Sequence, residues 1–330
     1  MERKVRVGIL GCARIAKAAL IDVAAADLEI AAIASRSGEA ADRFAAAHGI
    51  PVAYASYECL LEDQNIDAVY VPLPNSLHAE WTSRALLAGK AVLCEKPLAS
   101  NAAEAAALAE TARASGRPLM EAFHYRYHPL ARFVEETARS GALGEIKAIA
   151  ASLEIPGNLV PPGDIRFQAA LAGGALMDVG AYCVNALRHL TGEEFMPLRV
   201  YAELVSPGVD GGMRALVRFG SGIEGELRCS LTAERFLTEI RVEGEKGRLL
   251  VKNPFLPQMG HKVEMIIGAE RSERTFDTAP TYLFQAKAFS RAVRDGAPVL
   301  TTADDGVVNM RAIDALYRAA GMTPRLEGAA

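Results

Sequence analysis

Residues 5–16 read Val5-Arg6-Val7-Gly8-Ile9-Leu10-Gly11-Cys12-Ala13-Arg14-Ile15-Ala16, which is an apolar run followed by a glycine turn. The run has the length and composition of a buried strand. The last six residues fit the pattern G-x-G-x-x-G, with alanine in place of the second and third glycines. Such a turn leads a strand into a helix and directs backbone amides at a pyrophosphate. The stretch therefore indicates a dinucleotide site formed by Gly11, Cys12, Ala13, Arg14 and Ile15, with a purely structural turn as the alternative.

The residues that follow continue a rhythm of strands and helices up to about residue 120. Strand-like apolar runs lie at 5–10, 29–35, 68–71, 91–94 and 119–122, and alanine-rich helical stretches separate them. Ser37 can cap a helix over Gly38–His48, and Asn101 can cap a helix that ends before Gly116. This alternation predicts an α/β fold with a parallel sheet and helices on both of its faces.

After residue 144 the expected strands follow one another with few helices between them. We expect strands at 145–155, 199–204, 213–219, 223–230, 239–242, 248–251 and 263–267, and helices at 174–190, 281–295 and 303–319. This pattern predicts an α+β domain on a largely antiparallel open sheet with one helix-covered face. The sheet would take its apolar side chains from Val217, Phe219, Ile223, Leu227 and Leu231. Its bare face suggests a homodimer or a dimer of dimers, with packing on the first domain as the alternative.

Length and composition favour a globular chain of two domains. The 330 residues exceed the roughly 250–300 that one hydrophobic core supports. We place the domains at 1–123 and 124–330, and the final helices of the chain could pack back onto the first domain. Lys and Arg number 36 against 40 Asp and Glu, which gives a net charge of −4 with the signs interspersed. Nucleic acid would require a positive surface instead.

The sequence also indicates the cellular compartment of the protein. No apolar run approaches the roughly 20 residues that cross a bilayer, and residues 1–4 lead into the first strand without an apolar leader. We therefore expect a cytoplasmic protein with no membrane partner. The five cysteines are odd in number and form no Cys-x-x-Cys pair, which favours reduced thiols.

The end of the second strand distinguishes between the two nicotinamide dinucleotides. It reads Ala34-Ser35-Arg36-Ser37 and offers no carboxylate for a ribose 2′-hydroxyl. A guanidinium between two hydroxyls instead suits a 2′-phosphate, because charge-assisted hydrogen bonds to it are worth roughly 1.5–3 kcal/mol. Ser35, Arg36 and Ser37 thus predict NADP(H) over NAD(H) by about tenfold or more, with NAD(H) still possible. The alternative is that Arg36 is a solvated surface cation.

Three further stretches carry a resemblance to a known family. They read Val71-Pro72-Leu73-Pro74-Asn75-Ser76-Leu77-His78, Cys94-Glu95-Lys96-Pro97 and Gly173-Gly174-Ala175-Leu176-Met177-Asp178-Val179-Gly180-Ala181-Tyr182. Together they resemble the glucose-fructose oxidoreductase and inositol dehydrogenase family (Gfo/Idh/MocA) over nearly the whole chain. The resemblance implies an N-terminal Rossmann domain, an antiparallel-sheet domain, and hydride exchange between a nicotinamide and a carbinol carbon of a sugar, polyol or related diol.

The resemblance also implies roles for single residues. Lys96 would lie beside the nicotinamide, with its ammonium aimed inward by a cis Lys96–Pro97 bond, and Asp178 and Tyr182 would meet a common substrate from one helix. Tyr182 stands where inositol dehydrogenases have histidine, and looks like the branch of glucose-fructose oxidoreductase, NADP-dependent xylose dehydrogenase and dihydrodiol dehydrogenase. The implied cofactor contacts continue with Pro72, Leu73, Asn75, His78, Glu95, Lys96, Arg166 and Phe167. The implied substrate contacts are Lys96, Phe123, Tyr125, Asp178, Tyr182 and Tyr282. His124 and His128 receive no role, and their spacing with His78 matches no zinc motif, so we expect no metal.

Alcohol oxidation needs a base for the hydroxyl proton, and Tyr182 is the candidate. A phenol has an ordinary pKa of about 10, so the ammonium of Lys96 would have to favour the phenolate. Asp178 would orient a substrate hydroxyl or Lys96. An ordinary helix-core ring is the alternative for Tyr182. Two other functions stay open: a glycoside hydrolase that retains its NAD, and a non-catalytic NAD(P)-sensing protein.

Overall fold

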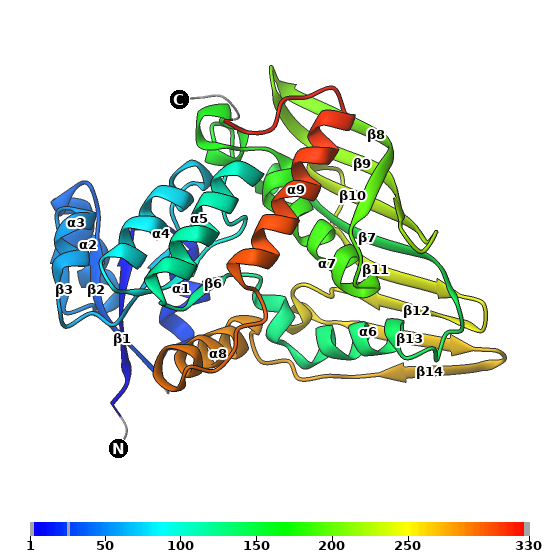
Figure 1. Ribbon diagram of the computed structural model, residues 1–330, viewed down its shortest axis with the longest axis horizontal. Coiled ribbons are helices and arrows are strands. Elements are labelled where there is room, and N and C mark those ends of the chain that lie inside the picture. The colour runs from blue at the N-terminus through cyan, green and yellow to red at the C-terminus, as the bar shows by residue number, and fades with distance from the viewer. Residues whose placement is uncertain (1–2, 25–26, 327–330) are drawn as a thin grey trace. The chain divides into compact units, whose positions relative to one another are not determined.

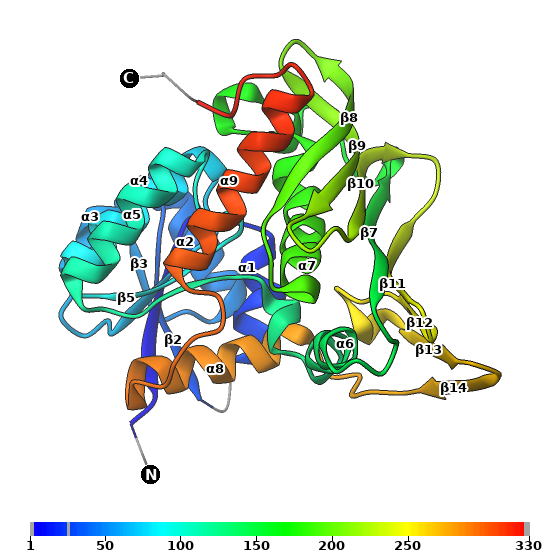
Figure 2. The same ribbon diagram turned by 45° about the vertical axis from the view of Figure 1, so that its right-hand side comes forward.

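The computed structural model describes residues 3–24 and 27–326, so Met1 and Glu2 of the chain's start lie outside it. The chain divides into two units (Figures 1 and 2). Unit 1 comprises Met1–Tyr127 and Thr281–Val307, and unit 2 comprises His128–Pro280 and Val308–Ala330. The division passes through α9 (Ala303–Ala319).

Unit 1 contains a parallel six-stranded sheet in the order β3-β2-β1-β4-β5-β6. Its strands are β1 (Val5–Leu10), β2 (Leu28–Ala34), β3 (Val52–Tyr54), β4 (Ala68–Val71), β5 (Ala91–Cys94) and β6 (Leu119–Glu121). Its helices are α1 (Ile15–Ala19), α2 (Gly38–His48), α3 (Tyr57–Glu62), α4 (His78–Leu87), α5 (Ala102–Ser115) and α8 (Thr281–Asp295). This order is that of a Rossmann-type sheet, so the predicted α/β fold is confirmed.

The core of unit 1 follows from the alternation of side chains along its strands. Val7, Ile9 and Leu93 pack with Ala16 of α1 and Phe289 of α8 in one apolar cluster. The predicted caps are confirmed: the Ser37 hydroxyl accepts from the amide of Ala40, and the Asn101 carbonyl from that of Glu104.

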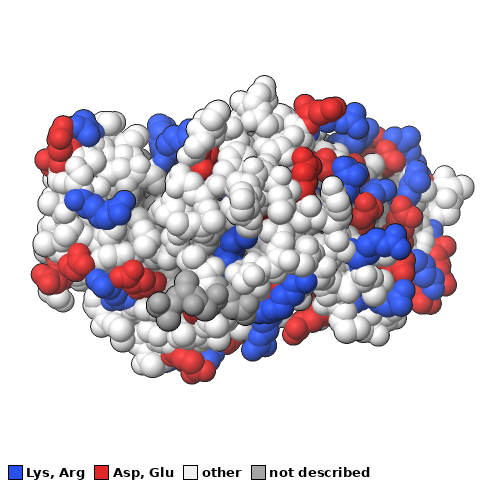
Figure 3. Space-filling model, turned by 90° about the horizontal axis from the view of Figure 1, so that it is seen from above, with Lys and Arg blue, Asp and Glu red and all other residues white. Residues whose placement is uncertain are grey.

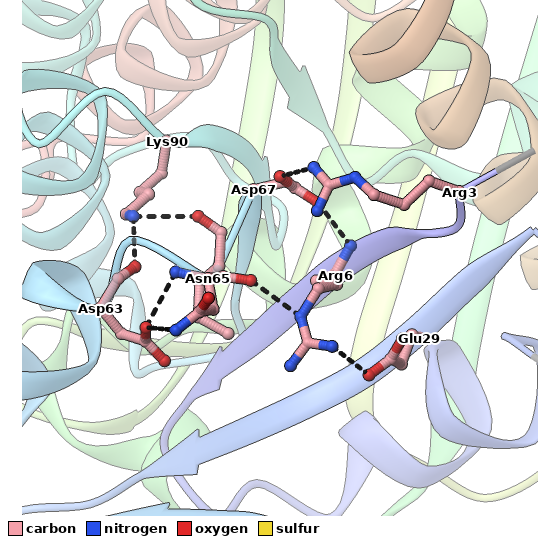
Figure 4. A network of polar contacts seen from close by, with 8 residues as sticks. Arg3, Arg6, Glu29, Asp63, Asn65, Asp67 and Lys90 are labelled. Atoms are coloured by element: carbon pink, nitrogen blue, oxygen red, sulfur yellow. Dashed lines mark hydrogen bonds and ion pairs between the residues drawn. The ribbon is translucent and has the colours of Figure 1, made fainter.

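A polar network ties together the strand starts, at the amino edge of this sheet (Figure 4). The carboxylate of Asp67 accepts from the Arg6 amide at 2.9 Å and from Arg3 at 2.5 Å. Arg6 also donates to Glu29 at 2.7 Å, and Lys90 donates to the carbonyl oxygen of Asp63 at 2.6 Å. These bonds fix the amino edge of the sheet. Ligands bind at the opposite, carboxyl edge in such folds, and other residues form that edge.

Unit 2 contains an eight-stranded sheet in the order β14-β13-β12-β11-β7-β10-β9-β8, in which only the β7·β10 pair is parallel. Its strands are β7 (Ile146–Pro156), β8 (Phe195–Ser206), β9 (Val209–Phe219), β10 (Glu224–Ala233), β11 (Leu237–Gly244), β12 (Gly247–Lys252), β13 (Lys262–Ile267) and β14 (Glu270–Arg274). Helices α6 (Pro129–Arg139) and α7 (Ala181–Thr191) pack together, and α7 lies on β7 and β10. The predicted open, largely antiparallel sheet is confirmed.

The two faces of this sheet differ in chemistry. Val217, Phe219, Leu227 and Leu231 are buried, whereas Ile223 is half-buried. Side chains at alternate positions form ion pairs instead, such as Arg228 with Glu154 and Arg241 with Glu226. Figure 3 shows the two signs interspersed at its right-hand end, where Figure 1 places these strands. The apolar residues quoted from the sequence therefore fill the covered face, because strand side chains alternate between faces.

One described segment, Ala169–Thr191, is long and apolar enough in composition to pass for a membrane span. It is weak evidence for one, because 83% of its most apolar window is buried inside the protein.

Candidate functional site

The turn after β1 has the geometry of a dinucleotide-binding turn. Gly11 has a φ of +98°, which side-chain-bearing residues rarely adopt, and its amide donates to the carbonyl of Ala34 at 2.8 Å. A Cβ at Gly11 would stand 2.7 Å from Cδ2 of Leu73. β1 lies between β2 and β4, where the strand order reverses, and ligands bind at such a switch point. Cys12 and Ala13 are half-buried beside Gly11, whereas Arg14 and Ile15 are exposed.

The end of β2 presents a cation at the same carboxyl edge. Arg36 is exposed, and Ser35 next to it is half-buried. The hydroxyl of Ser37 accepts from the Ala40 amide at 3.3 Å and thus caps α2. Burial raises the pKa of Tyr57, and the positive charge of the nearby Arg36 opposes that shift. Nothing in the sequence marked Tyr57, because this interaction joins the end of β2 to the first residue of α3.

The end of β5 is braced by two buried carboxylates. The hydroxyl of Tyr70 donates to Glu95 at 2.6 Å, and the Lys96 amide donates to the other oxygen of Glu95 at 3.3 Å. Two residues on, the Leu98 amide donates to Glu121 at 2.8 Å. The Lys96–Pro97 peptide bond is cis. Two carboxylates therefore hold the main chain on both sides of the cis bond in the turn that carries the half-buried Lys96.

His78 joins this turn to the one after β4. It is 1% exposed, and its ring nitrogens lie 2.7 Å from the carbonyl oxygens of Pro97 and Leu73. Desolvation lowers the pKa of His78, and these two carbonyl contacts oppose that shift. Both ring nitrogens thus contact the main chain. The neighbouring Pro72 and Leu73 are buried, and Asn75 is half-buried in a short 3₁₀ turn (Asn75–Leu77).

Aromatic residues follow β6 within unit 1. Phe123 and Tyr125 are both buried, with ring centres 6.4 Å apart, edge to face. The ring of His124 lies 4.2 Å from that of Tyr282, the second residue of α8. Burial and, after it, the positive charge of Lys96 together lower the pKa of His124 to about 3. His124 is therefore a neutral imidazole near Lys96.

In unit 2 an arginine holds Asp178. Nε of Arg166 donates to Asp178 at 2.7 Å, and Nη1 of Arg166 lies 3.2 Å from Asp164. The charge of Asp178, and after it that of Asp164, raises the pKa of Arg166 against the effect of burial. Arg166 and Phe167 form a short 3₁₀ turn (Ile165–Phe167) capped by Asp164. The structure thus brings predicted cofactor and catalytic residues, Arg166 and Asp178, into one ion pair.

The helix expected at 174–190 begins with a π turn, Leu176–Gly180, before α7 continues it. Asp178 lies in the π turn and Tyr182 in the first turn of α7. The Tyr182 ring lies 5.4 Å from that of Phe255. π turns inside helices occur frequently at functional sites, and apolar periodicity does not reveal them.

His128 is a helix cap in unit 2. Its Nδ1 accepts from the Leu130 amide at 3.1 Å, and its Nε2 lies 3.1 Å from the carbonyl oxygen of Asp277. Among residues 3–24 and 27–326, no group of three His, Cys, Asp or Glu side chains is placed to hold a metal ion.

Comparison with known proteins identifies the family. Residues 5–123 match the model of the oxidoreductase family with an NAD-binding Rossmann fold, and residues 131–250 match the GFO/IDH/MocA C-terminal domain. The chain belongs to the GFO/IDH/MocA family. The resemblance drawn from the Lys96 and Asp178 motifs is therefore confirmed.

Relatives within the GFO/IDH/MocA family are similar over most of the chain. D-xylose 1-dehydrogenase (NADP(+)) 2 of Haloferax volcanii is 39% identical, over 95% of this chain and 96% of that protein. Trans-1,2-dihydrobenzene-1,2-diol dehydrogenase of Macaca fascicularis is 32% identical, over 89% and 90%. A crystal structure of a 3-ketoreductase from Actinomadura kijaniata, with NADP and TDP-benzene, superposes with a TM-score of 0.88 at 34% identity, over 96% and 98%.

Proposed function

We propose that the protein is an NADP(H)-dependent oxidoreductase that transfers hydride between the nicotinamide and a carbinol or carbonyl carbon of an aldose or a cyclic diol. The observation that carries the proposal is the row of residues along the carboxyl edge of the parallel sheet. Gly11 follows β1, Arg36 follows β2 and Lys96 follows β5. The relatives named above are a D-xylose dehydrogenase, a dihydrobenzenediol dehydrogenase and a 3-ketoreductase.

The residues of unit 1 fit a dinucleotide with a 2′-phosphate. Gly11 leaves open the space that a Cβ would fill beside Leu73, which permits close approach to a pyrophosphate. Arg36, whose charge acts on the nearby Tyr57, offers a guanidinium at the end of β2, where a 2′-phosphate would lie. We assign the adenine half to Ser35, Arg36 and Ser37, and the nicotinamide half to the turns that His78 and Glu95 hold. When bound, NADP(H) supplies or accepts the hydride.

We assign proton transfer to Tyr182. Its phenol must lose a proton to act as a base, and an ammonium close by favours the phenolate. We assign this role to the ammonium of Lys96. The proposal requires both side chains to reach the same substrate in the working enzyme. Asp178, held by Arg166 at 2.7 Å, stays an acceptor that can orient a substrate hydroxyl.

We further propose that unit 2 binds the substrate and forms a homodimer through its open sheet. The support is a set of exposed apolar side chains on the edge strand β8 and beside it, namely Met196, Leu198, Tyr201, Leu204, Val205 and Leu216. Exposed apolar patches commonly mark protein interfaces. Light scattering on the eluting peak of a size-exclusion column should give twice the monomer mass, and the monomer mass would contradict the dimer.

The deciding experiment offers the purified protein NADP⁺, or NAD⁺ separately, with a panel of aldoses, inositols and cyclic diols. Formation of reduced nicotinamide is followed by its absorbance. We expect turnover with NADP⁺ and at least one aldose or cyclic diol. Turnover only with NAD⁺ would contradict the cofactor assignment. Cleavage of a glycoside with tightly bound NAD and no net reduction would instead establish a hydrolase.

A further inference from the structure

A buried ion pair in unit 2 lies against the turn that begins the Asp178 helix. Asp210 of β9 is 0% exposed and Arg325, which follows α9, is 5% exposed, and their charged groups are hydrogen-bonded through Oδ1 and Nη2. The hydroxyl of Tyr317 in α9 donates to the same Oδ1 at 2.9 Å. The guanidinium carbon of Arg325 lies 4.3 Å from the centre of the Tyr317 ring. We name Asp210, Tyr317 and Arg325 the C-terminal anchor.

The C-terminal anchor is bonded to the main chain on both sides of Gly174. Nε of Arg325 donates to the carbonyl oxygen of Gly173 at 2.6 Å. The amide of Leu176 donates to Oδ2 of Asp210 at 2.7 Å. Leu176 is the first residue of the π turn that contains Asp178. The anchor therefore fixes the main chain where this helix begins.

Gly174 fits against the C-terminal anchor because it has no side chain. Its φ is +139°, and a Cβ there would stand 2.2 Å from Oδ1 of Asp210, 2.5 Å from Nη2 of Arg325 and 2.8 Å from the hydroxyl of Tyr317. Carbon atoms do not approach polar atoms so closely, so any side chain would displace the anchor or the turn. The glycine pair Gly173-Gly174 and the anchor are thus complementary in shape.

Two further bonds connect this turn to Asp178. The Gly174 amide donates to the carbonyl oxygen of Arg166 at 2.8 Å, and the Asp178 amide donates to the carbonyl oxygen of Gly174 at 3.0 Å. Arg166 in turn holds the Asp178 carboxylate through its side chain. A shift of Gly174 would therefore move both partners of the Arg166–Asp178 ion pair.

A buried ion pair is a poor source of stability, because desolvation offsets much of its attraction, but it can specify one geometry. We propose that Asp210, Tyr317 and Arg325 are positioning residues that set the π turn and so place Asp178 and Tyr182 for the reaction. The inference rests on the proposed function of those two side chains. It makes the segment after α9 a part of the catalytic machinery without any contact to substrate or cofactor.

The test compares Arg325→Met, the charge-balanced double variant Asp210→Asn/Arg325→Met, and Arg311→Met as a matched control. Arg311 is an exposed residue of α9. The single Arg325 variant leaves a buried charge without its partner and should melt at a lower temperature. The double variant removes both charges and should regain most of that loss.

If the C-terminal anchor positions the helix, the double variant keeps a kcat at least about tenfold below wild type although its melting temperature has recovered. Its affinity for NADPH, measured by calorimetry, should be unchanged, and hydrogen exchange in peptides covering residues 174–182 should be faster. Wild-type kcat and wild-type exchange in the double variant would overturn the inference. Arg311→Met should behave as wild type in all four measurements.

Tyr182→Phe separates this inference from the proposed function. A large loss of kcat in Tyr182→Phe together with normal kcat in the double variant would refute the C-terminal anchor alone. Normal kcat in Tyr182→Phe would refute the proposed role of Tyr182, and hydrogen exchange would then still decide whether the anchor holds the π turn.

Discussion

Arg36 should decide the choice between NADP(H) and NAD(H), because it is an exposed guanidinium at the end of β2. Arg36→Asp places a negative charge where the 2′-phosphate would lie. The Kd for NADP⁺ should rise at least about tenfold, which corresponds to about 1.4 kcal/mol, while that for NAD⁺ stays the same or falls. Calorimetry on both cofactors measures this. Arg132→Asp, an equal charge change on an exposed residue of α6, is the control. Equal losses in the two variants would contradict a specific contact.

Tyr182 should carry the proton transfer. Tyr182→Phe keeps the ring that packs on Phe255 and removes only the hydroxyl. We expect kcat to fall at least about a hundredfold, with the Kd for NADPH nearly unchanged. If Lys96 acts through this phenol, the losses in Lys96→Met and Tyr182→Phe should be strongly non-additive in the double variant. Stopped-flow and steady-state assays would measure both. Additive losses would assign Lys96 a separate role.

The site residues differ in how far the sequence could identify them. Lys96, Asp178 and Tyr182 lie in continuous motifs, which a single sequence displays. Tyr57 lies within the electrostatic influence of Arg36, and Arg325 is hydrogen-bonded to Asp210; these partners lie 21 and 115 residues away in the chain. Such pairs become visible only after folding brings distant segments together.

A side chain added at Gly174 should destabilise the protein more than one added at Gly49, the residue that follows α2. Gly174 and Gly49 both have positive φ, but a Cβ at Gly49, after α2, has nothing within 4 Å. Gly49→Ala should cost only its backbone strain, about 1–2 kcal/mol. Gly174→Ala should cost at least about 3 kcal/mol, because its Cβ would collide with Asp210. Denaturant unfolding measures the free energy of unfolding of both variants. Equal losses would mean that the C-terminal anchor shifts at Gly174→Ala with no loss of stability.

The sequence predicted those elements that have a strong apolar or capping signal. β1, β4, β5, α2, α8 and α9 begin and end where apolar runs, Ser37 and the glycines indicated. It missed β3 (Val52–Tyr54) and β14 (Glu270–Arg274), which have few buried residues and exist through backbone pairing with β2 and β13. It also missed the π turn, whose first amide, that of Leu176, donates to Asp210 of β9, a contact between distant segments that no local pattern displays.

Buried histidines should make the stability of the protein fall in mild acid. Unfolded His124 would have a pKa of about 6.5, whereas burial lowers the folded value to about 3. Between these values the unfolded chain binds a proton that the folded chain does not. The contribution to stability is therefore complete above about pH 6.5 and is lost as the pH falls. The same direction applies to His78 and His128, whose pKa values burial also lowers.

His124→Gln isolates one part of this effect. The variant loses the ring contact with Tyr282 and should be less stable than wild type at pH 7.5. Because glutamine does not titrate, the difference between the two proteins should shrink by about 1.4 kcal/mol on going to pH 5.5. Denaturant unfolding at the two pH values measures it. A difference that stays constant would mean that His124 binds its proton over the same pH range in the folded and unfolded protein. At pH 5.5 that proton would place a second positive charge near Lys96 and let His124 donate from both ring nitrogens.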